Sequence, residues 1–160
     1  MPESEPYLAK GKGELSLHMV NIDGFPDAEL LNKVLNLHEN IFKDSDTLIS
    51  KAENKSKIVF TVALEDEEVI GYKIGYELES DGFYSWLGGV DKNHRNKGVA
   101  SKLMNQQHLY LKEKGYKIVQ TKTKNKWRSM LVLNIKNGFD VIGTYTDREG
   151  ESKIILEKSL

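Results

Sequence analysis

The sequence predicts a mixed α/β fold, in which helices cover a mixed β-sheet within one domain. Some segments repeat apolar residues about every 3.6 residues, and others alternate apolar with polar residues or are rich in β-branched and aromatic ones. They follow one another in the order β-α-α-β-β-β-α-β-α-β-β, which is typical of a mixed sheet with helices on its faces. The 160 residues contain no linker or repeat, so we expect one domain over 1–160, with 1–13 as a loose lead-in.

The first part of the chain predicts a strand, two helices and three further strands. Pro26 and Asp27 are typical of a helix start, and the apolar residues that follow share one helical face as far as Phe42. Ser45 or Asp46 is suited to cap a second, short helix that ends near Asn54. The strands are expected at about 15–19, 58–64, 69–79 and 83–90.

The second part of the chain predicts two helices and three strands. After Gly98 the apolar residues return to a helical period, and Gly115 marks the end of that helix. Gly138 ends a further helix expected at 127–137, because glycine adopts the left-handed conformation that terminates helices. The strands are expected at about 116–123, 139–146 and 152–158.

The composition argues against several kinds of site and partner. The chain has no cysteine, which removes disulfides, thiolate zinc sites and a cysteine nucleophile, and its four histidines show no metal-binding spacing, so we expect no metal. A net charge of −1 gives no reason to expect nucleic acid or an anionic membrane as a partner. No apolar run approaches the ~20 residues that span a bilayer, and the polar N-terminus lacks a signal-peptide core, so a cytoplasmic protein is the simplest interpretation.

Cations gather where the strand that ends at Val90 passes through a polar loop into the helix near Gly98. The first N–H groups of a helix have no partner within it, and the helix dipole places partial positive charge there. Arg95 and Lys97 add positive charge, and Gly98 allows a ligand to approach the backbone. The corner therefore predicts a phosphate or pyrophosphate site, although neither a P-loop nor a GxGxxG dinucleotide motif is present.

The same segment resembles the acetyl-CoA signature of the GNAT superfamily of N-acetyltransferases, (Arg/Gln)-x-x-Gly-x-(Gly/Ala). It reads Arg95-Asn96-Lys97-Gly98-Val99-Ala100 in this chain. The order of elements is also that of the family, and the stretch from Leu133 to Phe139 resembles the family's Gly-Phe helix ending. The resemblance implies a GNAT-like fold with acetyl-CoA as co-substrate between two splayed central strands. The residues it assigns to the phosphates are Arg95, Asn96, Lys97, Gly98, Val99 and Ala100.

The resemblance also implies how the rest of the co-substrate lies and reacts. The pantetheine arm would pair with the edge of the strand at 88–90, which splays from its neighbour near Ile118. A backbone N–H near Gly89 or Val90 would hold the thioester oxygen as negative charge develops on it. A primary amine attacks the thioester directly in a ternary complex, without a covalent enzyme intermediate.

The acid and base of this reaction are the point at which the chain departs from the family. The family often carries a tyrosine that protonates the leaving thiolate, and Asn134 stands in its place. Asn134 could donate a hydrogen bond to the thiolate and touch the co-substrate, or it could be a buried amide tied to the backbone. Glu77 is the first candidate for the base, ahead of Glu79, Asp81 and Tyr84, and a water chain without a single base is the alternative.

Three functions compete at this point. The first is an N-acetyltransferase that transfers acetyl from acetyl-CoA to a small-molecule or peptide amine, as a monomer or homodimer. The second is a CoA-binding sensor or scaffold of little or no activity, which only Asn134 favours. The third is a nucleic-acid-binding domain that uses the basic residues at 122–128, against which the near-neutral net charge argues.

Overall fold

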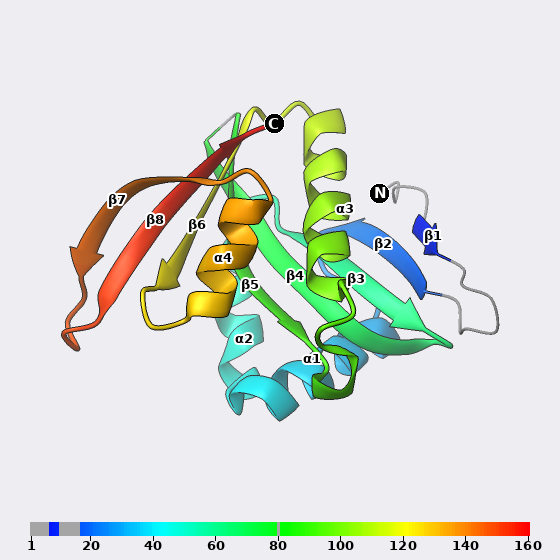
Figure 1. Ribbon diagram of the computed structural model, residues 1–160. Coiled ribbons are helices and arrows are strands. Elements are labelled where there is room, and N and C mark those ends of the chain that lie inside the picture. The colour runs from blue at the N-terminus through cyan, green and yellow to red at the C-terminus, as the bar shows by residue number, and fades with distance from the viewer. Residues whose placement is uncertain (1–6, 10–16, 80) are drawn as a thin grey trace.

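The computed structural model describes residues 7–9, 17–79 and 81–160, which form one mixed sheet between two layers of helices (Figure 1). The strand order is β1-β2-β3-β4-β5-β6-β8-β7. Helices α1 (Ala28–Phe42) and α2 (Ser45–Ala52) lie on one face, and α3 (Val99–Glu113) and α4 (Arg128–Lys136) lie on the other. None of the helices in these residues is long and apolar enough to cross a membrane.

The observed elements confirm the predicted α/β fold and its order. The strands are β1 (Tyr7–Ala9), β2 (Leu17–Asp23), β3 (Val59–Glu65), β4 (Glu68–Glu79), β5 (Gly82–Val90), β6 (Ile118–Lys124), β7 (Asp140–Thr146) and β8 (Ser152–Ser159).

Two elements were not predicted, and one predicted boundary cannot be compared. The short strand β1 lies in the segment that the sequence assigns to a loose lead-in, and it pairs antiparallel with β2. A 3₁₀ turn, η1 (Lys92–His94), lies in the loop before α3. The rest of the lead-in, and Leu15 and Ser16 at the predicted start of the first long strand, lie outside the described residues.

An apolar core and a set of side-chain hydrogen bonds through a buried histidine hold the first helical layer against the sheet. Asp27 caps α1 by accepting a hydrogen bond from the Leu30 N–H at 2.9 Å. His38 of α1 is buried and hydrogen-bonded at both ring nitrogens, to the Tyr72 hydroxyl of β4 and to Asp44 before α2. These bonds tie α1 to the sheet and leave His38 satisfied. The buried apolar residues of this layer are Val20, Val34, Leu37, Leu48, Ala52, Ile58, Phe60, Val62, Tyr72 and Ile74.

On the second face, glycines of β4 allow α3 and a ring of β5 to approach the strand. A Cβ atom at Gly71 would lie 2.8 Å from Leu103 and 3.3 Å from Val99, both in the first turns of α3. A Cβ at Gly75 would overlap the Phe83 ring and lie 2.5 Å from the Tyr84 carbonyl oxygen. Alternate residues of β4 therefore face α3, and the start of α3 is fixed closely against the sheet.

We expect Gly75→Ala to destabilise the protein by about 1–3 kcal/mol, because a backbone oxygen cannot move aside for the new methyl group. Gly143→Ala, in β7, is the matched control, since its Cβ would be at an ordinary 3.6 Å from Ile155. We expect that substitution to change stability by less than about 1 kcal/mol. Urea unfolding of the two variants measures the difference, and equal stabilities would contradict the packing described here.

Candidate active site

The parallel strands β5 and β6 pair over only three residues and then separate. The pairs are Gly82–Ile118, Phe83–Val119 and Tyr84–Gln120, whereas β5 stays paired with β4 as far as Val90. Figure 1 shows the two strands diverging, with α4 in front of the space between them. We call this divergence the fork, with 85–90 on the β5 side and 121–124 on the β6 side.

A β-bulge lies where the fork begins. Ile74 of β4 pairs with Leu87 and Gly75 with Ser85, so Trp86 is the extra residue on β5. A bulge bends its strand and increases the local twist, which directs the rest of β5 away from β6. The Thr121 hydroxyl donates to the Ser85 carbonyl at 3.0 Å, so a side chain satisfies the first carbonyl beyond the ladder.

Beyond the bulge, alternate backbone groups of β5 face the fork. The Asp91 N–H donates to the Ile70 carbonyl of β4 at 2.8 Å. Because peptide groups alternate in direction along a strand, the N–H of Gly89 also faces β4, and those of Gly88 and Val90 face the fork. Of the two donors that the sequence predicts, Val90 thus lies on the open edge. Gly88, which the sequence did not single out, is the second donor there.

Gly89 contributes close packing. A Cβ there would lie 2.7 Å from Ile41 of α1. A larger residue there would force the Ile41 side chain to shift, so Gly89 lets α1 pack against the end of β5 without that change.

The loop after β5 leads to a helix N-terminus that no side chain caps. Asn96 (φ 62°) and Gly98 (φ 79°) are both left-handed, and α3 starts directly after Gly98 with no acidic residue in its first turn. A Cβ on Gly98 would meet nothing within 4 Å, so the side of Gly98 that its Cβ would occupy is open. Arg95 folds back and donates from Nε to the Val90 carbonyl at 3.1 Å, which fastens this loop to the end of β5.

His94 holds the loop to the neighbouring hairpin. Its Nδ1 lies 2.7 Å from Asp91 Oδ2, and its Nε2 lies 3.0 Å from Glu65 Oε1 at the end of β3. The hydrogen bond to Asp91, with further help from Glu65, raises the pKa of His94, and the same bond lowers the pKa of Asp91. The two carboxylates thus favour the protonated form of His94, while Lys97 stays exposed.

Buried polar side chains cluster on the face of the sheet that α3 and α4 cover. Asn134 is the one buried residue of α4, with 3% of its surface exposed. Both amide atoms of Gln107, His108 Nε2 and the Thr123 hydroxyl are buried without a hydrogen-bond partner among the described residues. Since buried polar groups are rarely left unpaired, this face is suited to a polar ligand that supplies the missing partners.

Glu77, the predicted base, lies on the same face but at the closed end of the fork. Its neighbour across the ladder is Phe83, which pairs with β6. The Tyr116 hydroxyl donates to Glu77 Oε2 at 2.7 Å, and Lys57 Nζ lies 3.7 Å from the same oxygen. Burial and this carboxylate raise the pKa of Tyr116. The Glu77 carboxylate is therefore already paired.

Aromatic side chains line the opposite face beside the start of the fork. The Tyr76 ring centroid lies 5.4 Å from that of Tyr84 and 5.9 Å from that of Trp86. Lys55 Nζ lies over both the Tyr76 and the Trp86 ring, at 4.7 and 5.3 Å from their centroids. These rings can accommodate an alkylammonium group on the face opposite Asn134.

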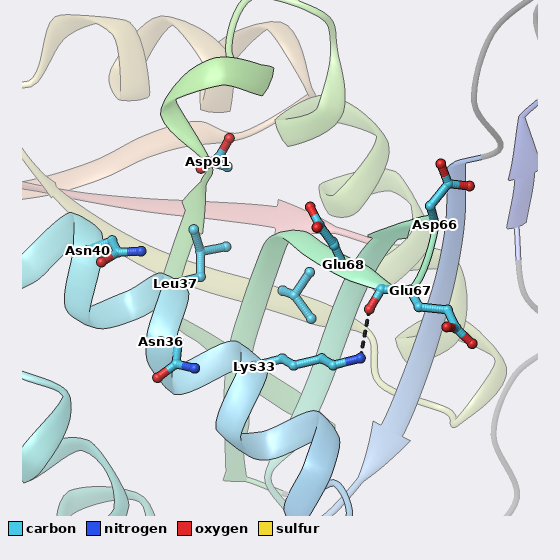
Figure 2. A pocket seen from close by; sticks show the side chains of 9 residues that line it. Lys33, Asn36, Leu37, Asn40, Asp66, Glu67, Glu68 and Asp91 are labelled. Carbon is cyan, nitrogen blue, oxygen red and sulfur yellow. Dashed lines mark hydrogen bonds between the residues drawn. The ribbon is translucent and has the colours of Figure 1, made fainter.

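A hollow of about 540 Å³ lies beside α1 (Figure 2). The charged residues of its lining are mostly acidic, whereas the loop before α3 carries Arg95 and Lys97. Figure 2 shows Lys33 reaching across it to donate to the Glu67 carbonyl, at 2.8 Å. Four carboxylates line the hollow, which disfavours a phosphate group there. Its lining residues are Lys33, Asn36, Leu37, Asn40, Asp66, Glu67, Glu68, Val69 and Asp91.

Comparison with known families identifies the family of the chain. The family model for the acetyltransferase (GNAT) domain matches residues 56–141, which is more than half of the chain. The chain belongs to the GNAT acetyltransferase family. The resemblance predicted from Arg95 to Ala100 is confirmed, and the protein is an acetyltransferase.

Solved structures show the same fold at low sequence identity. An IAA acetyltransferase from Bacillus cereus superposes with a TM-score of 0.73 at 20% identity, over 89% of this chain and 99% of that one. The ribosomal-protein-S18-alanine N-acetyltransferase from Escherichia coli gives 0.71 at 14% identity, over 87% and 93%. An aminoglycoside 6′-N-acetyltransferase complexed with coenzyme A gives 0.72 at 12% identity, over 86% and 96%. No curated protein sequence matches the chain significantly.

We expect the contribution of His94 to stability to depend on pH. Its pKa is raised on folding, so the stabilisation is complete below the ordinary histidine pKa near 6.5 and is lost as the pH rises through the folded value. Asp91 and Glu65 face the ring, and Arg95 is the nearby cation. Unfolding free energies of the wild type and His94→Gln should therefore converge as the pH rises above 7. A difference that grows with pH would contradict the assignment.

Proposed function

We propose that the protein is an N-acetyltransferase that transfers the acetyl group of acetyl-CoA to a primary amine by direct attack. The observation that carries this proposal is that one strand, β5, has an open edge and also leads into an uncapped helix start. Its edge is open along the fork, and its end leads directly into the uncapped start of α3. An extended, amide-bearing ligand with a pyrophosphate at one end fits this arrangement.

The loop and the first turn of α3 would hold the pyrophosphate. The N–H groups from Asn96 to Ala100 lie at or next to the positive end of the helix dipole, and nothing occupies the space in front of Gly98. Lys97 adds an exposed cation, and Arg95 keeps the loop in position through its bond to Val90. The backbone supplies most of this recognition, and the few cations supplement it.

The open edge of β5 would hold the pantetheine arm and orient the acetyl group. Acetyl-CoA brings the acetyl group as a thioester, whose carbonyl carbon is open to attack by an amine. The N–H groups of Gly88 and Val90 face the fork and can pair with an added extended segment. A donor of this kind stabilises negative charge that develops on the carbonyl oxygen, at no cost of reorganisation.

The amine would enter from the side of Tyr76, Tyr84 and Trp86. The phosphate loop continues into α3 on the other face, so the two substrates would meet in the fork from opposite sides. Asn134 would donate a hydrogen bond to the sulfur from α4. The assignment of Glu77 as the base stays a prediction, and its bonds to Tyr116 and Lys57 favour the alternative of a water chain.

We expect Gly98→Glu to weaken CoA binding at least ~100-fold, or about 2.7 kcal/mol, because the side chain would fill the space before α3 with a negative charge. Gly150→Glu is the matched control, since Gly150 is also left-handed (φ 81°) with nothing within 4 Å of its Cβ position. Calorimetric titration with CoA compares the two variants. Equal CoA affinity in both would overturn the placement of the pyrophosphate.

We expect release of free CoA thiol to require an amine and to match the acetylated product one for one. Direct attack leaves no acetyl group on the protein, so acetyl-CoA alone should give no stoichiometric burst of thiol. A thiol assay with a panel of amines, together with intact-protein mass spectrometry, tests both points. Tight CoA binding without turnover on a broad panel would favour the sensor or scaffold instead.

A further inference from the structure

A lysine of β4 lies on the face of the sheet where the sulfur leaves. Gly71 and Gly75 both face the layer of α3, since their Cβ positions meet Leu103 and the Phe83 ring. Lys73 lies between them, and side chains alternate along a strand, so Lys73 faces the same layer. Glu77, the predicted base, lies four residues farther along β4 on the same face, as the strand alternation predicts.

The Lys73 side chain leans toward the fork. Lys73 is paired with Gly88 of β5, and a Cβ on Gly88 would lie 3.4 Å from Lys73 Cγ. Because β5 is the last strand before the fork, a stem that passes beside Gly88 can extend its ammonium toward the open edge. The residue opposite Gly88 across the fork is Thr123, if the register of Tyr84–Gln120 is continued and Trp86 is skipped as the bulged residue. The buried hydroxyl of Thr123 has no hydrogen-bond partner among the described residues.

No carboxylate neutralises this ammonium among the described residues. Burial is the single cause that lowers the pKa of Lys73 to about 8. From α3 it faces His108, whose pKa falls to about 3 through burial and the cations Lys158 and Lys73. Lys158 of β8 donates to His108 Nδ1 at 3.1 Å. Two acids on this face have partners of their own: Glu77 is engaged by Tyr116 and Lys57, and Asp23 of β2 is engaged by Tyr110 and Lys114.

We propose that Lys73 is the proton donor to the leaving CoA thiolate, the role that Asn134 cannot fill. This inference rests on the proposed function. In the step, the amine nitrogen forms a bond to the acetyl carbon and the C–S bond breaks, with its electron pair going to sulfur. Lys73 Nζ gives a proton to that sulfur and is reprotonated from water. The proton released by the amine leaves to water on the opposite face.

The chemistry of the two groups is well matched. A thiol has an ordinary pKa of about 8.5, and proton transfer is most effective between groups of similar pKa that lie near the working pH. At pH 7 an amine with a pKa near 8 is mostly protonated and ready to donate. A cation beside the sulfur also stabilises the thiolate before the proton moves.

The decisive test uses the complex with CoA and needs no turnover. An opposite charge within about 4–6 Å lowers a pKa by about 1–3 units, so the thiol of bound CoA should titrate about one unit or more lower in the wild type than in Lys73→Met. Thiolate absorbance at saturating CoA measures this pKa. Lys158→Met, which removes the other cation beside His108, is the control and should titrate like the wild type. Equal thiol pKa values in the wild type and Lys73→Met would overturn the inference.

A second variant separates the charge of Lys73 from its proton. Arginine keeps the charge but cannot give up a proton at these pH values, so Lys73→Arg should keep the low thiol pKa. Its kcat should fall about 10²-fold or more, as in Lys73→Met, with little change in the KM for acetyl-CoA. In the wild type, kcat should fall as the pH rises through the Lys73 pKa, and both variants should lack this limb. Full kcat in Lys73→Arg would overturn the role of proton donor.

The outcomes also separate this inference from the proposed function. If the wild-type protein fails to bind CoA, the proposed function is wrong. If it binds CoA and acetylates amines while Lys73→Met matches it in thiol pKa and kcat, only the role of Lys73 is wrong.

Discussion

The site depends on one structural constraint, which is that the ladder between β5 and β6 stops after Tyr84–Gln120. Backbone N–H and C=O groups inside a protein need partners, so an open edge in the middle of a sheet is costly unless something pairs with it. Side chains satisfy two of the exposed carbonyls, with Thr121 at Ser85 and Arg95 at Val90. The N–H groups of Gly88 and Val90 face the same edge, and an extended ligand is the partner that the geometry favours.

The glycines of the central strands explain why the open edge of β5 lies close to the start of α3. Gly71 sets the first turn of α3 against β4, and this places the helix N-terminus next to the end of β5. Gly88 leaves room for the stem of Lys73, and Gly89 leaves room for Ile41 of α1 on the other face. A side chain at any of these positions would require a neighbouring side chain or backbone atom to shift, so the packing around the fork depends on these small residues.

The sequence predicts those features that depend on local order. Periodicity and capping residues placed the four helices, and Arg95 to Ala100 predicted the family, because these signals act over a few residues. Features that depend on register between distant strands were missed. Glu65 lies 29 residues from His94, and Lys73 acquires its setting only through its pairing with Gly88. The strand β1 was missed because three residues carry too little pattern.

The two faces of the fork also separate two proton transfers that oppose each other. Attack needs an amine that has lost its proton, whereas departure of the thiolate needs a group that still holds one. A single residue could not serve both needs at one pH without passing its proton across the reacting atoms. Here Tyr76, Tyr84 and Trp86 lie on one face, and Lys73 lies on the other with Asn134. Release of one proton to water and delivery of another to sulfur can therefore proceed independently. A chain without the tyrosine of its family retains in this way a complete route for both protons.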